Sequence, residues 1–304
     1  MANEVTPTSA ADLRVSQVLN ALVFDLLHDP TDLRRTCVRV PSAYSGSLTQ
    51  KIGQIQRSYG MAAPGELTAP SNTALVDSSF TVTPARRALK FTGSDLFQLS
   101  SAEGGIDLEA LAMIVAQQAG ITFTDMLCAL ATSLSNSVGG GAGSDFTVAN
   151  FFDAQFTLNS NNVPGPYYLV LKNNSFNEFQ TSLRAEDGTQ LSNDPAAREL
   201  LALMGPGFKG TFNGVNIIQS DSVTVNTGVN ENMMFGEGCF AYDEAAVGRI
   251  TPYVDRRIAV QDSSIFVTAA WDPDTATLGV VGNYYPGVSE AEDARGVLIN
   301  TDDA

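Results

Sequence analysis

Few residues of this 304-residue chain have the types and spacing that catalysis requires. His28 is the single histidine, and it ends a predicted helix beside Asp29, where helix capping or a surface position accounts for it. No Gly-x-Ser-x-Gly turn accompanies it, so a serine-nucleophile site is not indicated. A single histidine also excludes metal sites built from several imidazoles. The sequence therefore predicts no catalytic residue of the serine–histidine kind.

Acidic clusters are the other groups that could do chemistry. They occur at Asp272–Asp274, at Glu290–Asp293 and at Asp302–Asp303, and none has the spacing of an EF-hand. We interpret them as solvated turns and tail, and no pair stands out as glycosidase carboxylates. The Gly139–Gly143 run lacks the Lys-Ser/Thr of a phosphate loop and predicts a flexible linker. Catalytic, cofactor-binding and metal-binding residues are therefore all predicted to be absent.

Three cysteines, Cys37, Cys128 and Cys239, are widely separated and odd in number. They show neither a disulfide framework nor metal spacing, so we interpret them as structural thiols in a reducing compartment. Cys128 falls on the apolar face of a predicted long helix. We find no signal peptide and no apolar run of membrane-spanning length, so we expect a cytosol-like location and no membrane partner.

The charge of the chain is large and unevenly distributed. Seventeen bases and thirty-three acids give a net charge of −16. Residues 1–90 hold nine bases and seven acids, a net of +2, so the remaining residues carry −18. This balance argues against nucleic acid as the main partner, because phosphate binding needs clustered Lys and Arg. A basic arm and an acidic body can instead attract copies of the same chain.

The elements that must position these charges begin with a predicted helix at 12–27. Residues 36–92 then show two strand-like arms around a Gly/Pro-rich tip at 60–71, which predicts a long β-hairpin. Apolar residues at three- and four-residue steps predict a helix over Asp107–Ser137, roughly 45 Å long. Gly120 lies inside it, where it marks either a bend or a close packing contact.

A helix–strand–helix unit follows the glycine run. Its first helix is amphipathic, its strand is Tyr167–Leu171, and its second helix holds Phe176, Phe179 and Leu183. Another helix is predicted at 196–204, residues 208–282 read mainly as β-structure, and an acidic, loose tail is expected after Pro286. The apolar face of the first helix is expected to consist of Phe146, Ala149, Phe151, Phe152 and Phe156.

The predicted hairpin cannot neutralise its own charge. Residues 33–60 and 80–92 contain bases and no acid. A long hairpin is marginal alone in water, so we expect it to lie across an acidic neighbour and to bury apolar residues such as Val82 there. The predicted intersubunit contacts are Arg34, Arg35, Lys51, Ile52, Arg86, Arg87 and Lys90.

The order of these elements resembles the tailed-phage major capsid protein of the Hong Kong 97 type over residues 12–285. The most specific segments are Tyr167–Asn173, Phe212–Ser220 and Met234–Ala241. The resemblance implies an α+β fold, the Hong Kong 97-type capsid fold, with five parts along the chain. These are an N-terminal arm and helix at 1–35, an extended β-hairpin loop at 36–95, a peripheral domain with a spine helix at 96–199, an axial domain at 200–250, and return strands to the peripheral domain with an acidic tail at 251–304.

The resemblance also implies a structural role rather than an enzymatic one. Pentamers and hexamers of the chain would form an icosahedral shell that encloses double-stranded DNA without binding it specifically. The implied partners are a portal protein and, because little chain precedes residue 12, a separate scaffolding protein; a decoration or cement protein is a further candidate. The implied locations are the virion capsid and, during assembly, the host bacterial cytoplasm.

Some members of that family cross-link a loop lysine to an asparagine of a neighbour. Lys51 and Lys90 are the matching lysines here, and no partner asparagine is identified. Two alternatives remain open. A shell protein of a cellular encapsulin-type nanocompartment would have the same fold and enclose a protein cargo. An acidic hydrolase is the more distant alternative.

Overall fold

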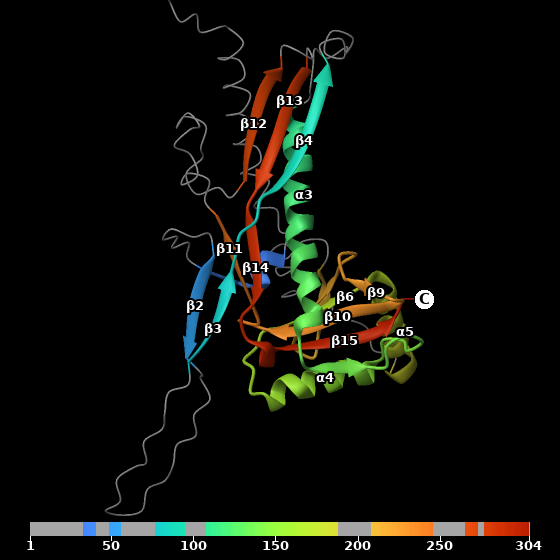
Figure 1. Cartoon of the computed structure of the whole chain (residues 1–304). Coiled ribbons are helices and arrows are strands. Elements are labelled where there is room, and N and C mark those ends of the chain that lie inside the picture. The colour runs from blue at the N-terminus through green and yellow to red at the C-terminus, as the bar shows by residue number, and fades with distance from the viewer. Residues whose placement is uncertain are drawn as a thin grey trace, which may run out of the picture.

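The computed structural model describes residues 33–40, 49–55, 77–94, 108–187, 208–245, 265–272 and 277–303. Helices and strands are mixed along these residues, in agreement with the expected α+β class. Figure 1 shows a globular part built on one sheet and, rising from it, a long helix beside a narrow sheet. Several predicted features lie outside the described residues: His28, the helices at 12–27 and 196–204, and the hairpin tip at 60–71.

The globular part is built on a seven-stranded mixed sheet. Its strands are β5 (Ser137–Gly139), β6 (Tyr167–Leu171), β7 (Phe208–Phe212), β8 (Val215–Gln219), β9 (Val225–Asn226), β10 (Val229–Gly236) and β15 (Gly296–Asp302). They follow the order β5-β15-β10-β6-β8-β7, and β9 pairs with β10. The central β6 ends in three buried residues, as expected for an apolar run covered on both faces. The predicted strand Tyr167–Leu171 is thus confirmed.

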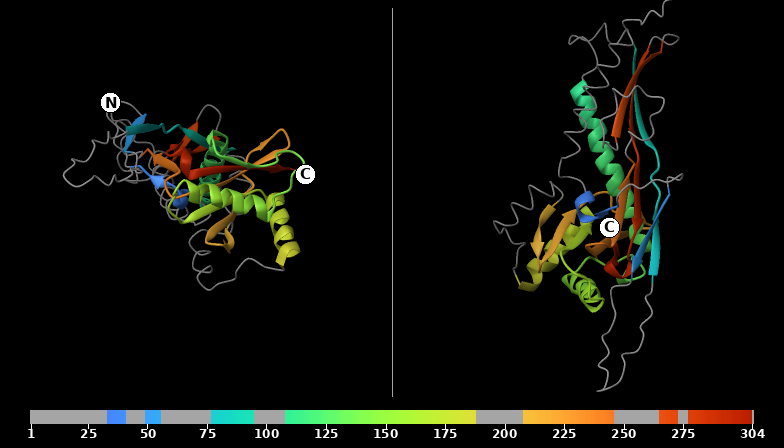
Figure 2. Two further views of the ribbon diagram at one scale, coloured as in Figure 1. Left: turned by 90° about the horizontal axis from the view of Figure 1, so that it is seen from below. Right: turned by 90° about the vertical axis from the view of Figure 1, so that its left-hand side faces the viewer.

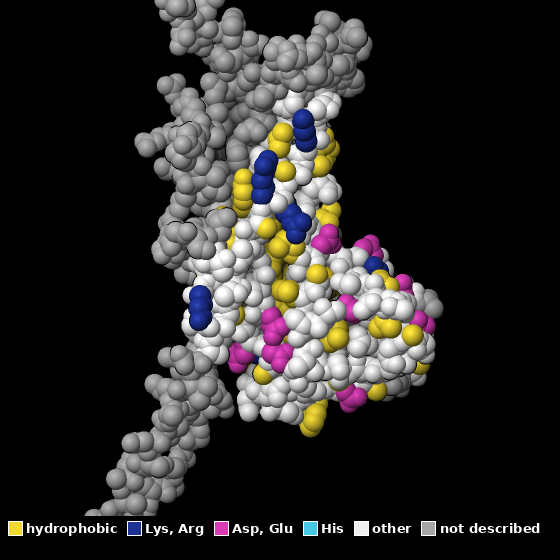
Figure 3. Space-filling view, viewed as in Figure 1, with side chains coloured by type: hydrophobic (Ala, Val, Ile, Leu, Met, Phe, Trp, Pro, Cys, Tyr) yellow, Lys and Arg dark blue, Asp and Glu magenta, His cyan; other side chains and the backbone are white. Residues whose placement is uncertain are grey.

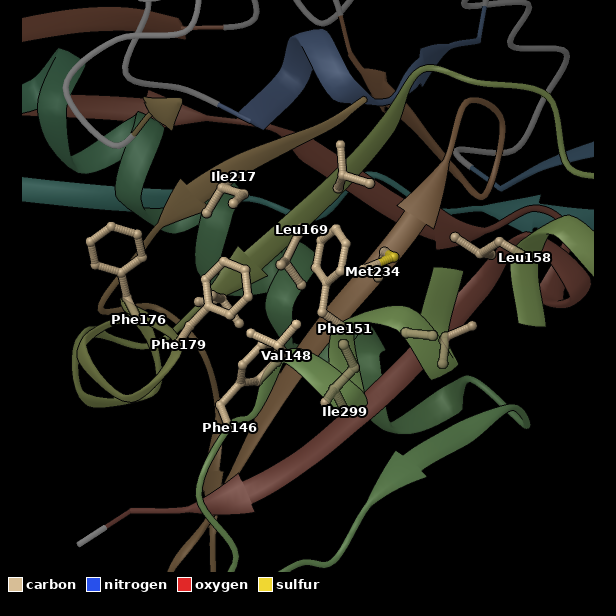
Figure 4. Close-up of a cluster of buried hydrophobic side chains, with 14 of the residues drawn as sticks. Phe146, Val148, Phe151, Leu158, Leu169, Phe176, Phe179, Ile217, Met234 and Ile299 are labelled. Carbon is tan, nitrogen blue, oxygen red and sulfur yellow. The ribbon is translucent and has the colours of Figure 1, made fainter. Parts of the chain in front are cut away.

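Two helices, α4 (Val148–Ser160) and α5 (Asn173–Asp187), cover one face of this sheet. Thr147 caps α4, because its side-chain oxygen accepts a hydrogen bond from the Asn150 N–H at 3.3 Å. Phe151 lies at the centre of the apolar layer (Figure 4), with its ring centroid 5.6 Å from that of Phe179 and 5.0 Å from that of Phe212. These rings anchor both helices to the sheet.

A buried polar network fixes the start of α5. Ser175 Oγ and Thr301 Oγ1 are 2.9 Å apart, and Asn232 Nδ2 donates to both oxygens. Asn230 Nδ2 also donates to Ser175 Oγ and to the Asp302 carbonyl. Because these side chains bond one another across α5, β10 and β15, the network sets the helix position on the sheet.

The opposite face of the sheet packs against α3 (Leu108–Cys128) and the 3₁₀ turn η2 (Ala129–Ser133). The predicted long helix therefore ends about nine residues early, and α3 is about 32 Å long. The Thr132 and Ser133 hydroxyls donate to the carbonyls of Ala129 and Leu130. Such local bonds compete with the α-helical pattern, and Leu134 then turns into the core.

The glycine run after η2 is ordered against the sheet, which corrects its prediction as a flexible linker. Gly139 ends β5 at a φ of +98°, and a Cβ there would lie 2.2 Å from the Asn300 carbonyl oxygen. The Gly141 N–H donates to the same oxygen at 3.3 Å. The backbone here approaches β15 so closely that a side chain at Gly139 would clash, which explains the glycine at this position.

A narrow sheet lies alongside α3 (Figures 1 and 2). Its strands are β4 (Arg87–Ser94), β12 (Ile265–Asp272) and β13 (Thr277–Tyr284), with β13 in the middle and both pairings antiparallel. Gly282 permits close packing of α3 on β13, since a Cβ there would lie 2.9 Å from Val115 Cγ1.

The predicted hairpin divides into two parts. Only β2 (Gln50–Ile55) and β3 (Asp77–Val82) pair with each other, whereas β4 pairs with β13. Between β3 and β4 the chain crosses β14 (Pro286–Glu290), where the Ala85 N–H donates to the Pro286 carbonyl at 3.0 Å. The predicted hairpin over 36–92 is therefore confirmed for the pairing of β2 with β3 and wrong for residues 87–92, which pair with β13. The pairing partners of β4 come from a segment almost 200 residues away, which local sequence does not reveal.

A third, three-stranded sheet joins the two main parts. It consists of β1 (Val38–Arg39), β11 (Phe240–Glu244) and β14, in that order. The predicted loose tail after Pro286 is wrong, because β14, the 3₁₀ turn η4 (Asp293–Arg295) and β15 are all ordered. β15 pairs with seven residues of β10 and buries Val297 and Ile299 in the core below α4.

The domain boundary predicted at residue 200 falls inside the central sheet. β6 precedes it, β8 follows it, and the two strands pair in parallel over five residues. The helix–strand–helix unit and the strands at 208–236 therefore form one structural unit rather than two. The narrow sheet with α3 forms the other part (Figure 1).

One apolar segment is longer than the sequence prediction allowed. Ile114–Ser133 has a length and mean hydropathy of 1.3 that would suffice to cross a membrane. In the structure 44% of that segment is buried, and α3 packs against η1 (Leu33–Thr36) and β14. The segment thus contributes Leu127, Cys128 and Ala131 to the protein's own core, whereas Ile114 and Ile121 are exposed.

Gly120→Ala is expected to stabilise the subunit by about 1 kcal/mol, because a Cβ at Gly120 would meet no atom within 4 Å and alanine favours the helix. Thermal melting of the free subunit measures the gain. A lower melting temperature would contradict the open surroundings of Gly120. Reduced self-association of a stabilised variant would instead place Gly120 in a contact between subunits.

Candidate functional site

Arg34 contacts other elements of its own chain, and its predicted contact with another subunit stays a prediction. Its Nη1 is 3.2 Å from Glu244 Oε1, and both side chains are nearly buried, at 14% and 10% exposure. The guanidinium carbon lies 5.5 Å from the ring centroids of Phe123 and Tyr284. Tyr284 Oη also donates to Glu244 Oε1 at 2.7 Å. The cluster joins η1 to α3, β11 and β13.

Arg34→Leu is expected to destabilise the isolated subunit by about 3 kcal/mol, because it leaves the Glu244 carboxylate buried without its cation. Urea unfolding of the subunit measures the loss. Arg35→Leu is the matched control, since Arg35 is exposed and its replacement should change stability by no more than about 0.5 kcal/mol. Equal effects of the two changes would refute the structural role of Arg34.

The base of the β2–β3 hairpin is attached to the same subunit. Gln50 Nε2 donates to the buried Asp243 Oδ2 at 2.5 Å. Val82 is fully buried with Val40 and Ala241, and Ile52 packs against this cluster. The expectation that Val82 is buried by a neighbour is therefore wrong. Lys51 remains exposed, and its contact with another subunit stays a prediction.

Three cations lie along β4 and the segment just before it. Arg86, Arg87 and Lys90 are all exposed. Arg86 Nε donates to Asn283 Oδ1 at 2.8 Å, so part of this side chain serves the fold. Within the described residues, the side chains of Arg87 and Lys90 make no hydrogen bond or ion pair.

The molecule separates its charges between two regions. Figure 3 shows Lys and Arg along the narrow sheet and the hairpin base, and Asp and Glu mainly over the globular part and near the base of the sheet. Exposed acids of the globular part and the adjoining end of α3 are Asp125, Asp145, Asp153, Asp221, Glu237 and Asp303. Regions of opposite charge attract one another, so the two regions of this chain are broadly complementary in charge.

The acidic cluster at 290–293 has a local structural role, which corrects its prediction as solvated tail. Ser133 Oγ bonds Glu290, and the Ser135 N–H donates to Asp293 Oδ1 at 2.8 Å. Glu292 pairs with Arg295 at 2.5 Å. These bonds hold the end of η2 against the segment between β14 and β15.

The cysteines have the environment of structural thiols. Cys128 and Cys239 are buried, and Cys37 is partly exposed, all as free thiols. Burial raises the pKa of the Cys128 thiol to about 12 and raises that of Cys239 as well. Protonated thiols are poor nucleophiles and poor metal ligands. No group of three His, Cys, Asp or Glu side chains suited to a metal ion is found among the described residues.

The architecture is shared with known capsid proteins. The capsid protein of Ralstonia phage GP4 matches with a TM-score of 0.62 and 11% identity, over 92% of this chain and 90% of that chain. The head structure of Helicobacter pylori bacteriophage KHP40 matches with a TM-score of 0.62 and 9% identity, over 90% and 91%. The SrpI encapsulin of Synechococcus elongatus matches with a TM-score of 0.58 and 11% identity, over 90% and 86%. The chain has the fold of phage capsid proteins.

This capsid fold is the one that the resemblance to Hong Kong 97-type coat proteins implied. No family model matches the sequence, and no curated protein matches it. The matches span the chain and its relatives almost end to end. The capsid fold therefore accounts for the globular part and for the narrow sheet with α3 together.

The capsid fold also exposes an apolar pair on α4 that the sequence placed wrongly. Phe152 is 45% exposed and Phe156 is 72% exposed. The buried face of α4 instead consists of Val148, Phe151, Ala154 and Leu158. The apolar residues of this segment are so closely spaced that the sequence is compatible with two different buried faces of the helix. The way in which α4 packs on the sheet decides between them.

Other important residues had no signal in the sequence. Glu244 and Tyr284 complete the Arg34 cluster from strands far apart in the chain. Neither stands in a motif. The pairing of β11 with β14 places Glu244 opposite Pro286, two residues after Tyr284.

Proposed function

We propose that this protein is a structural capsid protein, which assembles as pentamers and hexamers into an icosahedral shell around a double-stranded DNA phage genome. The supporting observation is the capsid fold, which spans about 90% of this chain and of the phage proteins that it matches. A fold shared end to end leaves little of the described chain for another activity. The role is structural rather than enzymatic.

The separation of charge supports self-assembly. Cations of the narrow sheet would lie against the acidic globular part of a neighbouring copy. In this arrangement α3 acts as the spine helix of a peripheral domain, and β2–β3 forms the base of the extended loop. Because one sheet crosses residue 200, we assign the helix–strand–helix unit to the axial domain together with the strands at 208–236.

The shell would confine DNA without binding it specifically. Free subunits, with a net charge of −16, are expected to bind duplex DNA no more tightly than about 10⁻⁴ M at physiological salt, because counterion release requires clustered cations. Fluorescence anisotropy with a labelled duplex measures this affinity. Nanomolar binding at physiological salt would contradict the prediction.

A second candidate is the shell protein of an encapsulin-type nanocompartment, which the similarity to the SrpI encapsulin favours. The fold alone suits both functions, and the contents of the shell separate them. A phage capsid would further work with a separate scaffolding protein and a portal protein, with a decoration or cement protein as an additional partner. It would assemble in the host bacterial cytoplasm and end in the virion.

Electron microscopy of the expressed chain, with and without candidate scaffolding protein, tests the proposal. We expect rings or closed shells with fivefold and sixfold contacts. A strict monomer under all conditions would refute the shell function. Shells purified from the native source with an enzyme cargo and no DNA would favour the nanocompartment.

A further inference from the structure

A hollow with both polar and apolar lining lies on the central sheet. Its volume is about 380 Å³, and its polar lining comes from Thr132 of η2, Asn226 and Thr227 of the β9–β10 turn, Glu231 of β10 and Asn300 of β15. Glu231 and Asn300 are directly paired across β10 and β15. The hollow therefore gathers polar residues from four separate segments, beside the apolar Val229 and Leu298.

Glu231 is the unusual member of this group. The residue is 5% exposed, and its Oε2 is buried without a hydrogen-bond partner in the part of the chain that the structure describes. A buried carboxylate without a partner is costly, and such a group in a native protein usually has water or an ion as its partner. The protein's own cations do not serve it: Lys172 Nζ donates to the carbonyls of Asp221 and Val223, and Arg295 pairs with Glu292.

The composition of the lining selects the kind of ligand. One carboxylate with neutral hydroxyl and amide oxygens is a hard, oxygen-rich set. Ca²⁺ usually takes six to eight oxygen ligands, whereas Mg²⁺ keeps several of its waters and binds through one or two carboxylates. A water molecule occupies about 30 Å³, so the hollow has room for an ion with its inner water shell.

We propose that this hollow binds a partly hydrated divalent cation of the Mg²⁺ class, with Glu231 as the charged ligand. Thr132, Asn226, Thr227 and Asn300 would accept hydrogen bonds from the water shell of the ion. Because the ion would join η2, the β9–β10 turn and the central sheet, its binding stabilises the globular part. The site is independent of what the shell encloses.

The test uses the full chain as free subunit. After treatment with EDTA, addition of about 10 mM MgCl₂ is expected to raise the melting temperature by about 2–4 °C, relative to NaCl at the same ionic strength. Calorimetric titration with Mg²⁺ should show one saturable site per chain. The same titration with Ca²⁺ should show weaker binding.

Glu231→Gln keeps the shape of the side chain and removes its charge. We expect it to abolish the Mg²⁺-dependent rise and to melt no lower than the wild type in EDTA, because an unpartnered buried charge is gone. Glu237→Gln is the matched control on the exposed turn after the same strand, and it should keep the full Mg²⁺ response.

Three results would overturn the proposal. One is a wild-type chain with no saturable Mg²⁺ site, a measurement that does not depend on the folding of any variant. Another is a Glu231→Gln chain that responds to Mg²⁺ as the wild type does. The third is a wild-type melting temperature that does not respond to Mg²⁺, together with a Glu231→Gln variant whose only defect is weaker self-association. That result would mean that a basic side chain of a second copy binds Glu231 in the hollow.

Discussion

Phe151→Ala is expected to lower the free energy of unfolding of the subunit by about 3–5 kcal/mol. Phe151 is fully buried between α4 and the central sheet, and its ring contacts those of Phe179 and Phe212. Phe179 in turn contacts Phe146. Removing the ring loses its burial and leaves a cavity that two rigid rings cannot fill. Since native domains are stable by only about 5–15 kcal/mol, much of the subunit population should unfold on mild heating.

Phe156→Ala is the matched control on the same helix. Phe156 is 72% exposed, so its truncation should change subunit stability by no more than about 0.5 kcal/mol. Urea unfolding followed by circular dichroism compares the two variants. Similar losses for both would mean that α4 is rotated relative to the register described here. A stable Phe156→Ala subunit that assembles poorly would identify Phe156 as part of a subunit contact.

Elements with strong local signals were predictable from the sequence. The apolar run Tyr167–Leu171 forms β6 as predicted, and its last three residues are buried on both faces of the sheet. A short apolar run between a turn and a helix is typical of a buried strand. The helices on either side were predicted as well. The length of α3 was overestimated, because periodicity continued to Leu134 while hydroxyl groups at Thr132 and Ser133 ended the helix.

Elements that depend on distant partners were not predictable. The acidic residues after Pro286 concealed Val297–Ile299, whose burial requires β10 as a partner from 60 to 70 residues earlier. The same applies to Arg87–Ser94, which reads as a hairpin arm and pairs with β13. Among the candidate site residues, the sequence grouped the cations as subunit contacts, which stays a prediction. It could not separate Arg34, which is bound to Glu244, from Arg87 and Lys90, whose side chains have no such partner within the described residues.

Arg87→Glu combined with Lys90→Glu is expected to leave the subunit folded and to abolish or strongly reduce shells at low salt. Both side chains are exposed on β4 and make no ion pair within the described residues, so subunit stability should change little. These two positions are better suited than Arg86, whose Nε bonds the buried Asn283. An exposed ion pair contributes about 0–1 kcal/mol, and charge reversal also introduces repulsion, so each subunit contact would lose on the order of 2–4 kcal/mol.

Salt distinguishes this electrostatic effect from a packing effect. The Debye length is about 10 Å at 0.1 M salt and about 3 Å at 1 M, so repulsion between reversed charges and the acidic globular part should weaken as salt rises. Shell yield and shell melting temperature, measured against ionic strength, should therefore recover partly in the variant. Arg87→Gln with Lys90→Gln should give an intermediate defect, because it removes attraction without adding repulsion. Unchanged shells of the Glu variant at low salt would mean that apolar and backbone contacts hold neighbouring subunits, and that the separated charges of this fold serve another purpose.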